Sequence, residues 1–183
     1  MSHPDTSSEA LAATYNSYTG GEVMGILRKN QWIGGEVTPE IEAWCGRAAA
    51  MLGHHATTPE ALEALVRFVF HYDANEILAT REAHAVLTRH ATRDVIRQLS
   101  LLLLEPAPFD SERFKAVVTE LRDSLEVRSR DLFHPIRLVL AGKAGEGELD
   151  RVILLLDEAA ALPFGVPVKS VRSRILEFCS ALI

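Results

Sequence analysis

The spacing of the apolar residues is the feature that most constrains this chain. From Gly20 onward, nearly every segment repeats apolar residues at intervals of three or four positions. One such stripe, spaced i, i+3, i+4, i+7 and i+11, consists of Ile41, Trp44, Cys45, Ala48 and Leu52. This spacing is typical of amphipathic helices, and no segment alternates convincingly with the period of two that marks a strand. The sequence therefore predicts an all-α fold, a multi-helix bundle or superhelix.

Two helix starts share the sequence Thr-Pro-Glu, at residues 38–40 and 58–60. A threonine suits the N-cap, proline suits the first helical position, and a glutamate suits the positive end of the helix dipole. Asp73 is expected to cap a short helix, and Asp110 or Ser111 a longer one. These positions predict where several helices begin.

Breaks in the helical pattern suggest the domain organisation. Residues 1–19 have no sustained period and predict a flexible N-terminal tail. The segment 105–108, with prolines at 106 and 108, is the clearest interruption of the helical pattern. It predicts two small helical subdomains, 20–105 and 106–183. A helix from about Ala83 to Leu104 is expected to break near His90. Another is expected to start near Pro135 or to be kinked by it.

Charge and cysteine content limit the class of protein. The 183 residues hold 19 Lys+Arg against 25 Asp+Glu, a formal charge of −6, so a nucleic-acid partner would need a local basic face. Residues 1–50 are the more acidic end, so we expect such a face on the middle and C-terminal helices. Cys45 and Cys179 lie far apart in the sequence and predict buried thiols in a reducing cytoplasm. No apolar run is long enough for a signal peptide or a membrane span.

No catalytic or metal-binding constellation stands out. His-Glu-x-x-His is absent, and the neighbouring His54 and His55 are expected at a helix end. Residues 141–145 look like a phosphate loop, but Arg137 stands where an earlier glycine is needed and Ala144 where a hydroxyl is needed. We therefore expect a protein that is not an enzyme and needs no cofactor or metal.

Basic residues recur at helical spacing and are the candidate binding residues. Three sets are apparent: a ridge of Arg89, Arg93 and Arg97; a second set of Arg130, His134, Arg137 and Lys143; and a C-terminal run of Lys169, Arg172 and Arg174. Such residues could position a phosphate backbone. They could equally be solvated helix faces paired with the abundant carboxylates, and the spacing leaves both readings open. Aromatic residues are 7% of the chain, which argues against a surface that stacks many bases.

The segment Leu-Phe-His-Pro-Ile-Arg-Leu-Val-Leu-Ala-Gly, residues 132–142, resembles a motif of known proteins. It is similar to the Pro-Leu-Arg-Val-Ala-Leu-Thr-Gly type motif in the C-terminal anticodon-binding domain of bacterial glutamyl-tRNA synthetases, which are class I enzymes. In that family a variable loop follows, then a helix like residues 147–156 and a final helix bearing arginine. The similarity extends roughly from Glu22 to the C-terminus and includes the Phe-rich segment 68–73.

The resemblance implies an all-helical, two-part module that receives the anticodon arm of tRNA. It implies phosphate contacts by Arg137 and Lys143 at the motif, together with Arg130 and the ridge formed by Arg89, Arg93 and Arg97. The chain lacks the His-x-Gly-His and Lys-Met-Ser-Lys-Ser signatures that hold ATP, so we expect no aminoacylation by this chain alone. Met1 and the polar tail predict a natural start, and hence a free-standing tRNA-binding module.

Two departures from the family pattern keep an alternative open. Ala141 replaces the family's threonine, which removes a hydroxyl that could contact a base, and the segment 157–170 is longer and richer in proline. With the acidic charge, the lost hydroxyl favours a helical protein-interaction or regulatory module that kept the fold and lost RNA binding. A further possibility is a domain excised from, or partnered with, a catalytic chain. Under these readings the partner is a synthetase or another protein.

Overall fold

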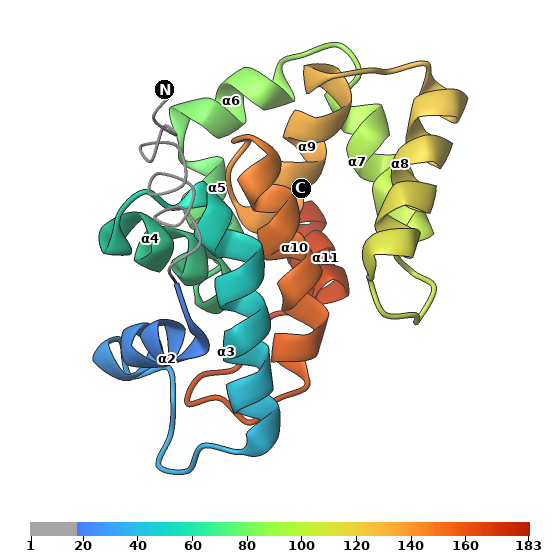
Figure 1. Cartoon of the computed structure of the whole chain (residues 1–183). Coiled ribbons are helices and arrows are strands. Elements are labelled where there is room, and N and C mark those ends of the chain that lie inside the picture. Colours follow the sequence, from blue (N-terminus) through green and yellow to red (C-terminus); the bar gives the residue numbers. More distant parts are fainter. Residues whose placement is uncertain (1–17) are drawn as a thin grey trace, which may run out of the picture.

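The computed structural model describes residues 18–183, and every regular element among them is a helix, which confirms the predicted all-α class (Figure 1). The elements in chain order are α2 (Gly20–Lys29), α3 (Pro39–Leu52), the 3-10 helix η1 (Gly53–His55), α4 (Pro59–Phe70), α5 (Ala74–Leu78), α6 (Arg81–Leu87), α7 (Thr92–Leu102), α8 (Ser111–Leu125), α9 (Arg130–Ala141), α10 (Gly147–Ala160) and α11 (Val171–Ala181). The predicted tail over 1–19 lies almost entirely outside the described residues.

The helix starts predicted from capping residues are confirmed. Thr38 and Thr58 accept hydrogen bonds from backbone N–H groups three residues ahead, at 3.2 and 3.1 Å. Asp73 caps α5, and Asp110 rather than Ser111 caps α8. Each cap satisfies a backbone donor that the first helical turn would leave free.

Two expectations about interrupted helices have different outcomes. The break near His90 is confirmed, because α6 ends at Leu87 and α7 begins at Thr92. The start of a helix near Pro135 is wrong: α9 begins at Arg130 and continues through the proline. Pro135 has no N–H to donate to the carbonyl four residues earlier, and the surrounding buried apolar residues hold this helix in place regardless.

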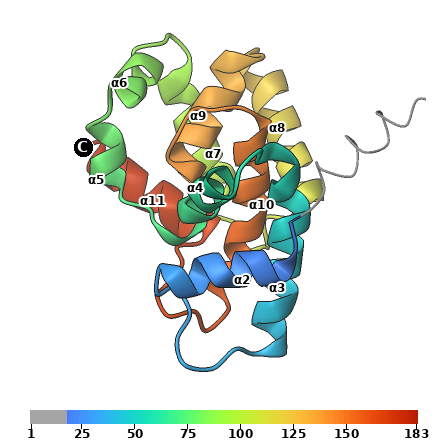
Figure 2. The same ribbon diagram turned by 60° about the vertical axis from the view of Figure 1, so that its left-hand side comes forward.

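Helices from both halves of the chain share one apolar core. Helix α10 packs against α3 and α4 as well as α9, and α11 packs against α5 (Figures 1 and 2). Trp44 of α3 donates from its indole nitrogen to the carbonyl of Leu155 in α10, at 3.2 Å in the buried interior. The expected boundary at residues 105–106 thus falls in an exposed connection, and the elements before and after it contribute to the same core.

An aromatic cluster joins the last connection, between α10 and α11, to the first helices. Trp32 stacks on Phe70 with ring centroids 4.9 Å apart, and Phe164 meets Trp44 edge-on at 5.2 Å. The N–H of Gly165 donates to the carbonyl of Trp32 at 2.6 Å. A Cβ at Gly165 would lie within 2.9 Å of backbone atoms, so only glycine permits this close approach.

Both cysteines are free: Cys45 is fully buried as predicted, whereas Cys179 is only partly buried, contrary to the prediction. Burial raises the pKa of the Cys45 thiol to about 11, so it remains protonated and packs as a small apolar side chain. His54 and His55 lie in η1 at the end of α3, as expected. None of the helices between residues 18 and 183 combines the length and apolar character that crossing a membrane requires.

Candidate nucleic-acid interface

Arg137, the central residue of the motif, is buried in α9 and paired. Its Nε and Nη2 donate to the two carboxylate oxygens of Asp150 at 2.9 and 3.0 Å, and only 10% of its side chain is exposed. Its guanidinium also lies 4.9 Å from the ring centroid of Phe133. The direct phosphate contact implied for Arg137 does not fit this geometry, because Asp150 occupies the fork of donors. The residue instead fastens the start of α10 to α9.

The loop between α9 and α10 depends on two glycines in left-handed conformations. Gly142, at φ +90°, ends α9, and its N–H donates to the carbonyls of Arg137 and Leu138. Gly145, at φ +40°, has no room for a Cβ because the side chain of Leu149 fills that space. Lys143 lies exposed between them, so the loop presents a cation to solvent.

Arg89, Arg130, His134 and Arg137, here called the α9 basic cluster, gather around the imidazole of His134. Nη1 of Arg89 donates to Nδ1 of His134 at 2.8 Å, which requires that nitrogen to be unprotonated. Burial lowers the pKa of His134, and the charges of Arg89, Arg137 and Arg130 lower it further, opposed by Glu146. The structure therefore brings together cationic residues that lie far apart in the sequence.

The ridge of Arg89, Arg93 and Arg97 is not continuous. Its spacing assumed one helix, but Arg89 lies in the turn between α6 and α7, where it faces His134. Arg93 and Arg97 remain on the exposed side of α7, one turn apart. No side-chain hydrogen bond or ion pair within residues 18–183 joins them to the α9 basic cluster.

The C-terminal basic run has a different character from the one the sequence suggested. Arg174 is fully buried and donates to four backbone carbonyls, while Lys169 pairs with Glu177 and donates to the carbonyl of Tyr72. Only Arg172 is exposed. Two members of this run therefore stabilise the fold and do not form a binding surface.

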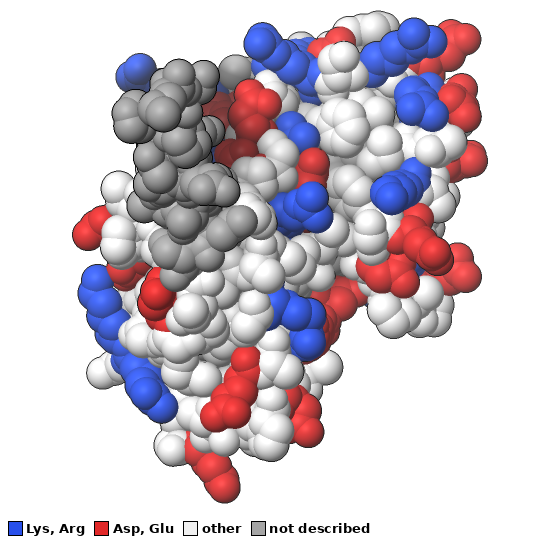
Figure 3. All heavy atoms as spheres, viewed as in Figure 1, with Lys and Arg blue, Asp and Glu red and all other residues white. Residues whose placement is uncertain are grey.

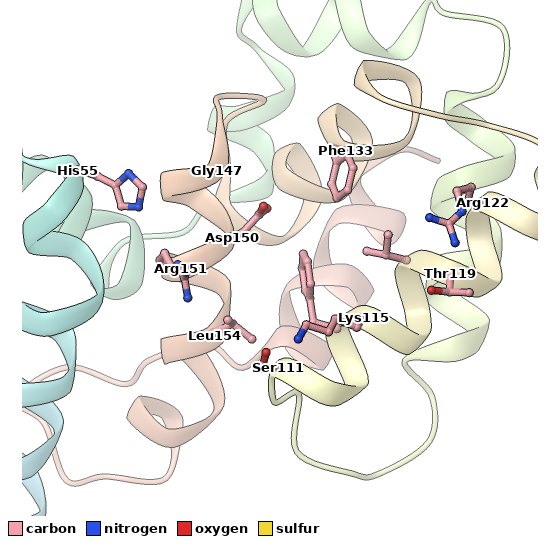
Figure 4. A pocket seen from close by; sticks show the side chains of 12 residues that line it. His55, Ser111, Lys115, Thr119, Arg122, Phe133, Gly147, Asp150, Arg151 and Leu154 are labelled. Atoms are coloured by element: carbon pink, nitrogen blue, oxygen red, sulfur yellow. The ribbon is translucent and has the colours of Figure 1, made fainter.

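A groove between α8, α9 and α10 was not anticipated from the sequence. It has a volume of about 530 Å³, and its apolar floor includes Phe133 and Leu154. Figure 4 shows the Phe133 ring reaching from α9 toward the space between α8 and α10, with Lys115 on α8 and Arg151 on α10 beside it. In Figure 3 several Lys and Arg side chains lie on the upper part of the surface that is drawn. The sequence held one indication of this groove: the motif places the aromatic residue Phe133 directly before the polar residue His134.

Across residues 18–183, no cluster of three or more His, Cys, Asp or Glu side chains has an arrangement suited to a metal ion. The titratable residues with resolved pKa shifts belong to the core or to the α9 basic cluster, except Glu63, whose pKa is lowered by hydrogen bonds from Lys29 and Asn30. The described surface therefore offers cations, hydroxyls and an aromatic ring, which are groups that bind phosphate and bases.

The fold and the site together define a class of protein: an all-helical module with basic residues around α9 and on the loop after it. A family model described as an anticodon binding domain matches residues 12–162, and the chain belongs to this family. It is 31% identical over 116 residues to "Glutamate--tRNA ligase 2" of Syntrophus aciditrophicus, an alignment covering 63% of this chain and 23% of that protein. It is 24% identical over 136 residues to "Glutamate--tRNA ligase" of Bacillus subtilis, covering 74% of this chain and 28% of the relative.

The chain thus spans about a quarter of the length of the curated relatives it matches. No solved structure gives a significant match. The resemblance noted from the motif is confirmed by the family match and by these relatives.

Proposed function

We propose that this chain is a tRNA-binding module that contacts the anticodon arm and does not itself aminoacylate tRNA. The α9 basic cluster carries the proposal, because it places Arg89 and Arg130 around His134 in a chain whose overall charge is −6. Lys143 lies exposed in the loop after the same helix. Both named relatives are tRNA ligases by name, and the anticodon-binding family model that matches residues 12–162 of this chain supports the same role. A cytoplasmic location follows from this role in translation.

Each basic residue has a proposed role. Arg89, Arg130 and Lys143 contact phosphates directly, and the exposed Arg93 and Arg97 extend this surface along α7. Arg137 acts as a positioning residue, because its pair with Asp150 holds the loop that carries Lys143. Ala141 is buried, so a hydroxyl at that position would face the interior, and its loss weighs little against RNA binding.

Binding of total tRNA, measured by filter binding at rising salt, tests the proposal. Wild type should bind most tightly at low salt, and Arg130→Ala should weaken binding and reduce the slope of log affinity against log salt by about 1. Arg28→Ala is the matched control, because Arg28 is an exposed arginine on α2, away from α8 and α9 (Figure 1). No binding of tRNA at low salt would overturn the proposal.

A second candidate, a protein-interaction module, is favoured by exposed apolar residues at the end of α7 and in the turn after it. Leu101 on α7 and Leu104 in the turn are 56% and 47% exposed, which is unusual for leucines so close together. If tRNA does not bind at low salt, this candidate becomes the better reading. The substitutions Leu101→Ser and Leu104→Ser should leave tRNA binding unchanged if the RNA proposal is right.

The titration of His134 gives an independent measurement of the cluster. Its pKa should lie below the ordinary value of 6.5, and Arg89→Ala should raise it by removing one positive neighbour. Because the folded pKa is depressed, this group's contribution to stability is present above about pH 6.5 and is lost as the pH falls through the folded pKa. Histidine Cε1–H chemical shifts followed by NMR across the acid range measure both effects. An unchanged pKa in Arg89→Ala would contradict the contact.

A further inference from the structure

The groove between α8, α9 and α10 continues past Phe133 into a neighbouring hollow. The second hollow has a volume of about 480 Å³ and shares Val118, Arg122 and Phe133 with the first. It extends the surface to Arg128 and Ser129, just before α9. Together they form a track that is lined by the aromatic rings of Phe114 and Phe133.

Most of the charged side chains that line this track are cationic. Lys115, Arg128 and Arg151 are exposed and make no side-chain hydrogen bond or ion pair within the described part of the chain. Arg122 has only a 3.5 Å contact with its exposed neighbour Asp123. These cations therefore remain available to an anionic ligand.

The carboxylate that lines the track does not offset these cations. Asp150 is the acidic residue among the lining side chains, and both of its oxygens accept hydrogen bonds from Arg137. Its charge is therefore neutralised within the protein. The side chains that line the track therefore carry a net positive charge even though the whole chain is acidic.

The aromatic ring is positioned by the same pair. The guanidinium of Arg137 lies 4.9 Å from the ring centroid of Phe133, and its bond to Asp150 fixes the guanidinium in turn. Phe133 is half-buried, so its ring is held by packing and still borders the groove. A fixed aromatic surface flanked by cations binds a base by stacking and its phosphates by charge.

We propose that this groove holds one unstacked nucleotide of the RNA loop, with the base against Phe133 and the flanking phosphates near Lys115, Arg122 and Arg151. This inference rests on the proposed function and adds a specific subsite to it. The volume of about 530 Å³ lies within the range of roughly 300–1,000 Å³ that is common for small-ligand sites. An acidic peptide would satisfy the cations but would not need the aromatic ring, so the ring distinguishes the two ligands.

Two RNA hairpins with the same stem test the subsite. One carries a single-stranded loop of anticodon-loop length with 2-aminopurine in the loop, and the other is closed by a compact, fully stacked loop. Phe133→Leu keeps the apolar volume but removes the aromatic face. It should weaken binding of the open-loop hairpin by about 5- to 150-fold, leave the salt slope unchanged and remove the change in 2-aminopurine fluorescence that wild type causes on binding. Binding of the compact hairpin should not change.

Charge variants separate the subsite from general RNA affinity. Arg151→Ala and Lys115→Ala, both on exposed side chains, should each lower the salt slope for the open-loop hairpin, whereas Arg28→Ala should not. If wild type binds the open-loop hairpin and all three groove variants bind it equally well, the groove inference is overturned and the proposed function stands. Efficient competition by poly-glutamate that depends on Arg151 but not on Phe133 would also overturn it. Failure of wild type to bind either tRNA or hairpin would overturn the proposed function first.

Discussion

Replacing Arg174 by methionine should lower the free energy of unfolding by more than about 3 kcal/mol, the largest stability effect we expect from a single substitution in this chain. The side chain is fully buried in α11 and donates to the carbonyls of Phe68, Val69, Leu140 and Lys169 at 2.8–3.0 Å. Three of these carbonyls belong to the last turns of α4 and α9, where helices leave acceptors unpaired. Methionine fills similar volume but leaves these acceptors buried without donors.

Arg174 remains positively charged although its side chain is buried. Burial lowers the pKa of its guanidinium to about 10, which still leaves it protonated at neutral pH. The ring of Tyr72, 4.7 Å from the guanidinium carbon, covers it on one side. Four hydrogen bonds and this ring are the partners that make a buried cation tolerable.

Urea unfolding followed by circular dichroism measures this effect. Arg172→Met, two residues away on the exposed side of the same helix, is the matched control and should change stability by less than about 0.5 kcal/mol. Arg174→Lys should also be strongly destabilising, because an ammonium cannot reach four separated carbonyls. Similar midpoints for Arg174→Met and Arg172→Met would show that Arg174 is not the shared cap of α4 and α9.

The second large loss of stability is expected when the ion pair between Arg137 and Asp150 is broken by replacing one partner. Removing either partner leaves the other charge buried, at a cost of about 3–5 kcal/mol. The side chains are 10% and 23% exposed, so solvent screens the pair little. The double substitution Arg137→Leu with Asp150→Leu should cost clearly less than the sum of the single changes. A double-mutant cycle in urea measures the coupling, and additive losses would contradict it.

Substitutions of the same two residues distinguish a positioning role from direct phosphate binding. If Arg137 positions the loop, then Arg137→Leu and Asp150→Asn should both weaken tRNA binding, although they change the net charge in opposite directions. If Arg137 contacts phosphate, Asp150→Asn should free the guanidinium and strengthen binding. Affinities are compared at a temperature where both variants are folded.

The helical architecture could be predicted because its determinants are local. Apolar spacing and the N-caps at Thr38 and Thr58 act within one or two turns, so they can be read without knowing the tertiary structure. The break before Thr92 was also visible. The start of α9 was misplaced because buried packing around Pro135 overrides the local preference of proline.

The candidate site could be predicted only in part. Arg89, Arg130 and Arg137 were identified by residue type, and the motif located the loop that carries Lys143. Their individual environments depend on contacts between residues distant in sequence, such as Arg89 with His134. Helical spacing placed Arg89 on one ridge with Arg93 and Arg97, although the helix break expected near His90 separates Arg89 from them.

The basic residues that the sequence treated alike have separate environments in the structure. Arg174 and Arg172 lie two positions apart, yet one is in the core and the other in solvent. The groove was missed for a related reason, since its walls come from three helices and no single segment carries its signature. Only the folded chain brings Lys115, Phe133 and Arg151 together.

The hydrogen bond between Gly165 and Trp32 has a consequence for the order in which the chain can fold during translation. A ribosome releases Trp32, Trp44 and Phe70 well before Phe164 and Gly165 emerge, so the aromatic cluster stays incomplete until most of the chain has been made. During that interval the large indole rings remain open to water and to other nascent chains. The N-terminal helices are therefore expected to reach their final packing only after the connection between α10 and α11 has been made.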